Sequence, residues 1–346
     1  MRKMAALLVL LIGLPAMALA HPYDASTIIL TQPSSREARA LADFLYPYVK
    51  AGQERIELPY NTSYDAATEA LGLLHREYPE LCEMSNRWSI SYYTQEPDVA
   101  IAVEPQYYHD GSMARVVAAA QSIAGEAIGT QTERAEQLHD WVCRRTVYDK
   151  SGGHTASAYG SIINGYAQCE GYAKALVLLY RMAGIPAGMV TGTSWDDSYV
   201  QGSHAWVVAC IDGVNTLIDP TADDGSDGIV THWYYGLTDA QMAADHRVDA
   251  GSSVPECWSE SLSWHARRGL LVSDMSQMTD ILYNFVMSRE PVEIRFANPL
   301  LYKEFCERFD QIVDAYNASY GWGAGFYGAY RIWRNGFQQG VRLEWQ

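Results

Sequence analysis

The sequence predicts an α+β fold with an antiparallel pair of strands at its centre, and three observations support this. Apolar residues recur at helical spacing in several segments, whereas shorter runs alternate apolar and polar residues as strands do. A helical pattern follows Cys169 directly. The dipeptide Asp212-Gly213, a strong two-residue hairpin turn, separates two apolar runs.

The first 20 residues are typical of a secretory signal peptide. A basic start at Arg2 and Lys3 precedes an apolar run over residues 5–17 and the small tripeptide Ala18-Leu19-Ala20. We therefore expect residues 1–20 to be removed and the mature protein to be periplasmic or secreted. No later apolar stretch approaches the ~20 residues of a spanning helix, so we predict no transmembrane anchor.

Residues 21–128 are predicted to form an N-terminal α+β region. Helices are expected over residues 34–48, 64–77 and 114–128, because apolar side chains there fall on one helical face. Between the second and third helices, residues 88–92 and 99–103 alternate in the manner of strands.

Residues 129–250 are predicted to form the central core. The segment Thr130–Glu133 has the pattern of a capping box, which starts a helix through residue 145. A second helix should span residues 170–182 and end at Gly184-Ile185-Pro186, because proline cannot continue the hydrogen-bond ladder. Strands are expected over residues 189–191, 205–211 and 214–218.

Residues 258–346 are predicted to form a small C-terminal α+β region. Helices are expected over residues 275–287 and 300–316, with Pro299 in the first turn of the second one, and a strand over residues 292–296. The segment 320–328, rich in glycine and aromatic residues, is expected to be a loop. It could line a groove or fill the core of this region. Asn335-Gly336 marks a terminal hairpin.

The charge of the chain limits its partners. The formal net charge is -16, which argues against nucleic acid or an anionic membrane as a partner. The oligomeric state is not predicted. Six cysteines are present, and an export pathway would permit disulfides among them. No C-x-x-C pair occurs, so no structural zinc site is predicted.

Cys169 has the setting of a nucleophile. It follows an irregular stretch and lies at or near the N-terminus of the predicted helix, where free N–H groups and the helix dipole favour a thiolate. The same N–H groups are placed to donate to an oxyanion. Taken alone, a single cysteine is more often a buried thiol or half of a disulfide.

The predicted hairpin brings His204 and Asp219 to one face of the sheet. A two-residue turn pairs Ile211 with Val214, and counting outward makes His204 and Asp219 diagonal neighbours on adjacent strands. This separation suits a hydrogen bond between imidazole and carboxylate. The prediction depends on the register, because a shift of one residue would place the two side chains on opposite faces.

Five short motifs follow one another in the central region. They are Cys-Glu-Gly-Tyr-Ala-Lys-Ala (169–175), Ala-Gly-Ile-Pro (183–186), Gly-Ser-His-Ala-Trp (202–206), Ile-Asp-Gly (211–213) and Ile-Asp-Pro-Thr (218–221). In this order they resemble the core of the transglutaminase-like superfamily, in particular its bacterial transglutaminase/protease-like group related to cytokinesis proteins. Supporting segments extend the resemblance over about residues 137–246, ending at Asp245-His246. One departure is the apolar pair Val207-Val208 after the third motif, where relatives often carry a polar residue.

The resemblance implies a papain-like cysteine-proteinase core, with an antiparallel sheet packed on the helix of the nucleophile. It implies Cys169 as nucleophile, His204 as general base and acid, and Asp219 as the group that orients the imidazole. The expected activity is acyl transfer on peptide or protein amides, by hydrolysis or transamidation, with a peptide, a protein or a cell-envelope component as substrate. The alternative is an inactive domain of this fold that serves as a binding module, which a disulfide from Cys169 to Cys143 or Cys210 would favour.

Several other polar residues are candidates for the site. Gln168 and Tyr166 are alternatives for an additional oxyanion donor, and each is at least as often structural. Asp223 and Asp224 could form a weak cation site, although a solvated acidic loop is the better interpretation. His139 is expected to pack or hydrogen-bond. We predict no cofactor and no metal.

Overall fold

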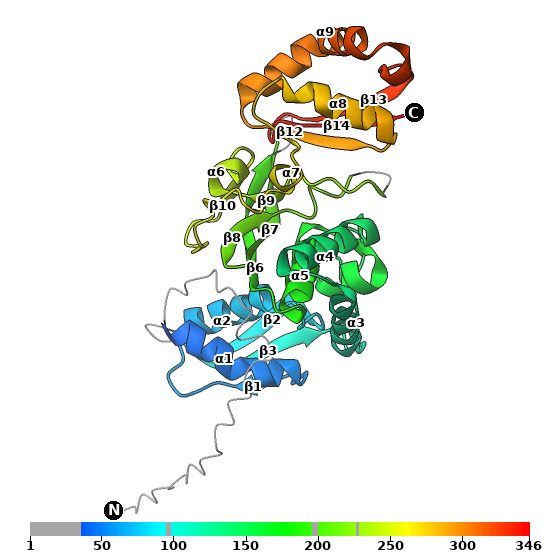
Figure 1. The fold of residues 1–346 in the computed structure, drawn as a ribbon. Coiled ribbons are helices and arrows are strands. Elements are labelled where there is room, and N and C mark those ends of the chain that lie inside the picture. Colours follow the sequence, from blue (N-terminus) through cyan, green and yellow to red (C-terminus); the bar gives the residue numbers. More distant parts are fainter. Residues whose placement is uncertain (1–35, 95–97, 196–199, 226–227) are drawn as a thin grey trace, which may run out of the picture.

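The computed structural model describes residues 36–94, 98–195, 200–225 and 228–346. The predicted signal peptide lies outside these residues. Three groups of elements follow one another along the long axis of the molecule, from an N-terminal unit through a central core to a C-terminal unit (Figure 1). In the described residues, no helix is both long and apolar enough to cross a membrane.

The N-terminal unit packs two helices against a three-stranded antiparallel sheet. The strand order is β1-β3-β2. Leu41, Leu45, Leu71 and Leu74 lie on the inner faces of the helices and are buried in one apolar cluster with Val103 from the sheet. The unit comprises α1 (Arg36–Lys50), β1 (Ile56–Glu57), α2 (Tyr64–Glu77), β2 (Met84–Tyr93) and β3 (Val99–Tyr107).

The central core packs α5 against a five-stranded antiparallel sheet of order β10-β6-β7-β8-β9. The predicted α+β class is therefore confirmed. Two further helices cover α5, and Val116 of α3 and Leu138 of α4 are buried in the same cluster as Leu176. Its main elements are α3 (Ser112–Glu126), α4 (Gln131–Arg145), α5 (Cys169–Met182), β6 (Ala187–Trp195), β7 (Gln201–Ile211), β8 (Val214–Ile218), β9 (Tyr235–Leu237) and β10 (His246–Val248).

Short elements complete the connections of the core. A parallel pair of strands and a π-helical turn precede α5, and a single-turn helix lies between β9 and β10. Thr130 forms the predicted capping box, since its hydroxyl accepts from the N–H of Glu133, whose carboxylate accepts from the N–H of Thr130. These connecting elements are β4 (Val147–Tyr148), η2 (Gly160–Asn164), β5 (Tyr166–Ala167) and α6 (Asp239–Met242).

The C-terminal unit packs two helices against a four-stranded sheet of order β11-β12-β14-β13. One prediction is wrong here. α9 continues through Ala324, so residues 320–324 are helical and the predicted aromatic loop begins only at Gly325. Phe326 then enters the apolar core of the unit. The elements are α7 (Trp264–Arg267), β11 (Leu271–Val272), α8 (Gln277–Ser288), β12 (Val292–Phe296), α9 (Pro299–Ala324), β13 (Tyr330–Asn335) and β14 (Gly340–Trp345).

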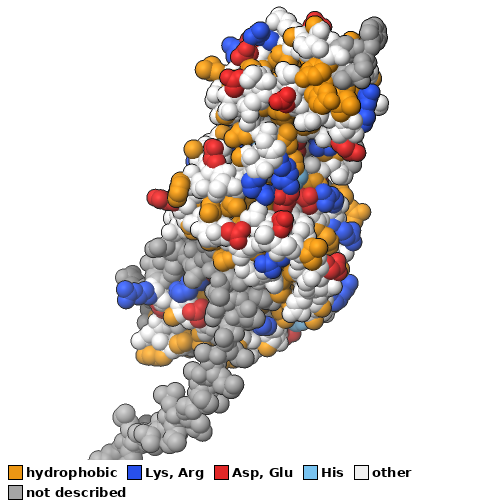
Figure 2. Space-filling view, viewed as in Figure 1, with side chains coloured by type: hydrophobic (Ala, Val, Ile, Leu, Met, Phe, Trp, Pro, Cys, Tyr) orange, Lys and Arg blue, Asp and Glu red, His pale blue; other side chains and the backbone are white. Residues whose placement is uncertain are grey.

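Charged side chains are mixed on the molecular surface. On the face shown in Figure 2, lysine and arginine side chains lie among aspartate and glutamate side chains, and the described residues form no continuous basic surface there.

Candidate active site

Cys169 is the first residue of α5. Gln168 precedes it in an extended conformation and its backbone carbonyl accepts from the N–H groups of Gly171 and Tyr172. The N–H groups of Cys169 and Glu170 therefore come before the first intrahelical bond, as at any helix start. This places the thiol at the positive end of the helix dipole, where an anion is stabilised.

Gly171 allows the loop before the helix to pack closely against its first turn. A Cβ at this position would lie 2.3 Å from the backbone oxygen of Thr155 and 2.8 Å from the Cβ of Ala167. Both distances are shorter than van der Waals contact. A glycine two residues after Cys169 therefore fixes where the nucleophile sits relative to the loop.

His204 and Asp219 meet through the β7–β8 hairpin in the predicted register. Ile211 pairs with Val214, and Val207 with Ile218. The Nε2–H of His204 donates to Oδ2 of Asp219 at 2.7 Å. The two-residue turn thus places the imidazole and the carboxylate on one face, as the local rules of hairpins predict.

Asp219 is completely buried and its carboxylate has several donors. Oδ1 accepts from the N–H groups of Thr221 at 2.9 Å and Ala222 at 3.2 Å. Oδ2 accepts from His204 and from Nε2 of His246, the latter at 3.1 Å. Burial alone would raise the pKa of Asp219, but the charge of His204 and the hydrogen bonds of both histidines hold this pKa well below its usual range.

His204 connects the carboxylate to the thiol. Because its Nε2 faces Asp219, Nδ1 is the ring nitrogen that remains for the hydrogen bond with Cys169. Burial lowers the pKa of His204, but the charge and hydrogen bond of Asp219, together with Cys169, raise it to about 10. The hydrogen bond with Cys169 is thus one of the contacts that favour the protonated form of His204.

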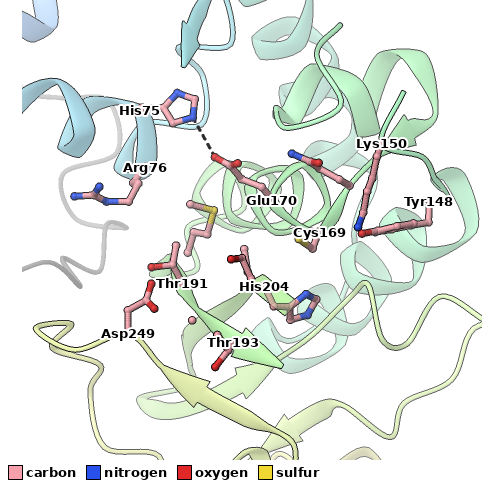
Figure 3. A pocket seen from close by; sticks show the side chains of 15 residues that line it. His75, Arg76, Tyr148, Lys150, Cys169, Glu170, Thr191, Thr193, His204 and Asp249 are labelled. Atoms are coloured by element: carbon pink, nitrogen blue, oxygen red, sulfur yellow. Dashed lines mark ion pairs between the residues drawn. The ribbon is translucent and has the colours of Figure 1, made fainter. Parts of the chain in front are cut away.

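A cleft of about 510 Å³ exposes the Cys169–His204 pair to solvent (Figure 3). Its wall combines the N-terminal unit, at His75 and Arg76, with the core, at Thr191 and Thr193. A smaller cavity of about 220 Å³ adjoins it and shares several lining residues, which are His75, Lys150 and Gln168. Together these cavities leave room for a chain-like substrate on both sides of Gln168.

Glu170, next to the nucleophile, joins α5 to the N-terminal unit. Its carboxylate lies 3.1 Å from Nε2 of His75 (Figure 3). The same carboxylate lies 2.8 Å from Nζ of Lys174. Burial would raise the pKa of Glu170, but the charge of Lys174 and the hydrogen bond of His75 lower it to about 2. The N-terminal unit is therefore tied to the first turn of the helix that carries Cys169.

The two alternatives for the additional oxyanion donor differ in position. Gln168 lines both cavities, and its side chain does not cap the helix. Tyr166 is half exposed on β5 and is not among the residues that line either of these cavities. Gln168 is thus the better placed of the two.

A second polar cluster lies between α4 and the segment before β9. Nδ1 of His139 lies 3.2 Å from Oδ1 of Asp140, and Nε2 of His232 donates to the same oxygen at 2.9 Å. Nε2 of His139 lies 3.2 Å from Asp223. His139 packs and hydrogen-bonds, as the sequence led us to expect.

The acidic pair after β8 corrects one interpretation. Asp223 is fully buried rather than solvated, because its Oδ1 accepts from the N–H of Tyr234 at 3.0 Å and from the hydroxyl of Thr231 at 3.1 Å. Oδ2 of Asp224 accepts a hydrogen bond from the hydroxyl of Tyr172. These bonds draw the loop inward, so the prediction of a solvated acidic loop is wrong for Asp223.

Hydrogen bonds account for the groups that resemble metal sites. Among the described residues, two groups bring histidine and carboxylate atoms within 4.8 Å of one another: His139, Asp140 and His232, and His204, Asp219 and His246. In each group one carboxylate oxygen accepts from both imidazoles. These distances are those of hydrogen bonds.

His246 is a site residue that the sequence analysis did not identify. The dipeptide Asp245-His246 contributed to the family resemblance, but nothing local indicated that it would reach Asp219. All six cysteines are free thiols, so Cys169 forms no disulfide with Cys143 or Cys210.

Comparisons with known proteins place the central part of the chain beside one superfamily. The sequence model of the transglutaminase-like superfamily matches residues 118–220, a segment that contains Cys169, His204 and Asp219. No protein in a curated collection matches the chain.

Similar solved structures include a candidate cysteine protease from Cytophaga hutchinsonii, at 18% identity with a TM-score of 0.27. The match covers 42% of this chain and 65% of that one. The periplasmic domain of TgpA from Pseudomonas aeruginosa has 19% identity and a TM-score of 0.25, over 36% and 56% of the two chains. A protein described as a TGase has 15% identity and a TM-score of 0.29, over half of each. The chain thus spans between half and two thirds of these proteins.

Proposed function

We propose, from the membership of residues 118–220 in the transglutaminase-like superfamily and from the bonding of the site, that this chain is an exported cysteine-dependent acyl-transfer enzyme acting on peptide or protein amides. The observation that carries the proposal is the continuous chain of hydrogen bonds from Cys169 through His204 to the buried carboxylate of Asp219. Such a chain activates a thiol and fixes the tautomer of its base.

Each residue has a distinct role in the proposed reaction. The thiolate of Cys169 attacks the amide carbonyl carbon, and the oxyanion that forms is stabilised by N–H groups at the start of α5 and by the amide of Gln168. His204 gives its proton to the leaving nitrogen, and the C–N bond breaks to leave a thioester. Water or an amine then attacks the thioester while His204 takes its proton. The C–S bond breaks, the carboxylic acid or the new amide leaves, and the thiolate of Cys169 is regenerated beside the protonated His204.

Hydrolysis is expected to compete strongly with transamidation in this site. The cleft is open to solvent, and true transamidation requires that water be kept away from the thioester. We therefore expect a peptidase or amidase activity ahead of cross-linking. Export rests on the signal-like residues 1–20, and deletion of that segment should leave the protein in the cytoplasm of the producing cell.

Alkylation of Cys169 tests the activated thiol without a substrate. Wild-type protein should react rapidly with iodoacetamide at pH 6, and His204→Ala should abolish that reaction, as read by mass spectrometry of the Cys169 peptide. Cys306→Ser, a change in the C-terminal unit, is the control and should react like wild type at Cys169.

A substrate screen tests the reaction itself. Wild-type protein should release amines from peptide amides or incorporate a labelled amine into a protein acceptor, and Cys169→Ala should do neither. Slow alkylation in wild type together with no turnover would sink the proposal and favour a binding module.

A further inference from the structure

The carboxylate of Asp219 is held by more than the imidazole of His204. Oδ2 accepts from two histidines, from Nε2 of His204 at 2.7 Å and from Nε2 of His246 at 3.1 Å. Oδ1 is held separately by the backbone N–H groups of Thr221 and Ala222. Because both oxygens have fixed donors, the plane of the carboxylate is fixed as well.

His246 is itself held on its other side. Its Nδ1 donates to Oδ1 of Asp245 at 2.7 Å, and the hydroxyl of Tyr234 donates to Oδ2 of the same carboxylate. His246 and Asp245 are almost fully buried. The hydrogen bonds therefore continue from Asp219 through His246 and Asp245 to Tyr234, away from the cleft.

The surroundings of His246 favour a ring with both nitrogens protonated. The titratable groups that face it are the carboxylates of Asp219 and Asp245, the imidazole of His204 with ring centroids 5.3 Å apart, and the phenol of Tyr234 at 5.7 Å. Trp206 packs edge-on against the ring at 5.0 Å. Burial lowers the pKa of His246, but the bonds to the two carboxylates outweigh it and raise this pKa.

We propose that His246 is a positioning residue of the active site, which holds Oδ2 of Asp219 in the place from which it orients His204. This inference rests on the proposed function. His246 does not touch the thiol or the cleft; it acts through Asp219. It lies on β10, beyond residues 118–220 to which the family match is confined.

The geometry explains why Asp219 needs a second donor. During turnover His204 must give its Nδ1 proton to the leaving group and recover one later, so its ring must keep a constant orientation while its charge changes. If His204 were the only donor to Oδ2, the two backbone amides on Oδ1 would still let the carboxylate rotate and move Oδ2. Nε2 of His246 is a second donor to Oδ2, and Asp245 fixes the ring of His246, so this rotation is prevented.

Two substitutions of nearly equal size separate the role of Nε2 from that of Nδ1. In His246→Gln the amide nitrogen reaches the position of Nε2 and can still donate to Asp219, whereas in His246→Asn the shorter amide reaches only the position of Nδ1. The control is His109→Gln, an exposed histidine of the N-terminal unit. The readout is the rate of Cys169 alkylation by iodoacetamide at pH 6.

We expect His246→Asn to slow alkylation by about 10- to 100-fold, the usual effect of losing a hydrogen bond to a buried charge. His246→Gln should stay within about threefold of wild type, because its amide still donates to Asp219. The His109→Gln control should do the same, because His109 lies outside the site. In the amide assay the kcat of His246→Asn should stay low after normalisation to the concentration of folded protein, because a loss of folded protein alone lowers only the apparent kcat. An alkylation rate for His246→Asn within twofold of wild type would overturn the proposal. Equal losses of alkylation rate in His246→Asn and His246→Gln would also overturn it.

A milder variant covers the case in which His246→Asn does not fold. Tyr234→Phe removes only the outer hydroxyl, and we expect a two- to fivefold slowing, whereas an unchanged rate would overturn the proposal. Failure of the proposed function gives a different result. Rapid alkylation of wild type without amide turnover would contradict the acyl-transfer function but not the positioning role of His246. Slow alkylation of wild type would contradict both proposals.

Discussion

Replacing Asp219 with asparagine tests the arrangement of the site most directly, because the two side chains have the same shape. Oδ1 of the residue must continue to accept from the N–H groups of Thr221 and Ala222. The new NH₂ group then takes the place of Oδ2 and faces the N–H of His204. Two donors repel each other, so Nε2 of His204 must give up its proton and accept from the new NH₂ group. The ring then carries its single proton on Nδ1 and cannot take up the proton of the Cys169 thiol.

The expected loss follows from the thiolate fraction at low pH. An unpaired thiol that titrates near ~8.5 is only about 0.3% ionised at pH 6, whereas a thiol that has given its proton to an imidazole is almost fully ionised. Asp219→Asn should therefore slow alkylation at pH 6 by roughly 300-fold. Turnover should fall by about four orders of magnitude, the effect of the wrong tautomer in a related triad.

The assay compares alkylation of wild type, Asp219→Asn and the control Asp280→Asn between pH 5 and pH 9. The control changes an exposed carboxylate on α8 and should match wild type throughout. Wild type should show a reactive plateau that extends below pH 7, and Asp219→Asn a single rise near ~8.5. Alkylation of the asparagine variant within threefold of wild type at pH 6 would refute the reasoning, because it would mean that the carboxylate does not set the tautomer of His204.

Two substitutions near the start of α5 test how the helix is anchored. Glu170→Gln removes a carboxylate whose pKa is lowered to about 2, so it should cost about 2 kcal/mol of unfolding free energy in urea titrations at pH 7. A depressed pKa stabilises the fold above the unfolded value near ~4.3, so this difference should shrink as the pH falls from about 5 toward 2; a constant difference would contradict the bond to His75. Gly171→Ala should destabilise by ~1–3 kcal/mol and slow alkylation of the thiol, because the new methyl meets the oxygen of Thr155. Gly125→Ala in α3, where the space is open, should instead stabilise by ~0.5–1 kcal/mol, and equal effects of the two changes would contradict the steric argument.

The parts of the site that sequence reasoning located are those fixed by local rules. A two-residue Asp-Gly turn permits one register, and that register determines that His204 and Asp219 share a face. A cysteine between an irregular segment and an apolar helical pattern must fall near a helix start. Such inferences need only a few consecutive residues, so they survive without knowledge of the tertiary structure.

The parts that were missed depend on contacts distant in sequence. Glu170 meets His75 across two packed units, and neither residue carries a local pattern that names its partner. The inward turn of Asp223 depends on the N–H of Tyr234, which β9 brings close. The length of α9 was also predicted too short, because the helix continues to Ala324 through glycine and aromatic residues that have weak helix propensity.

The contact of His246 with Asp219 shows how an edge strand can take part in a site whose core lies elsewhere. β10 pairs with β6, opposite the strand β7 that carries His204. Between them, Gly192 has no side chain, and a Cβ there would lie 2.2 Å from the oxygen of Arg247 and 2.7 Å from the ring of Trp206. The edge strand can therefore approach closely enough for His246 to reach past that ring to the carboxylate. A pattern of catalytic motifs that ends at Asp219 contains the reacting groups, but the part that keeps them oriented comes from β10, the second strand after Asp219 along the chain.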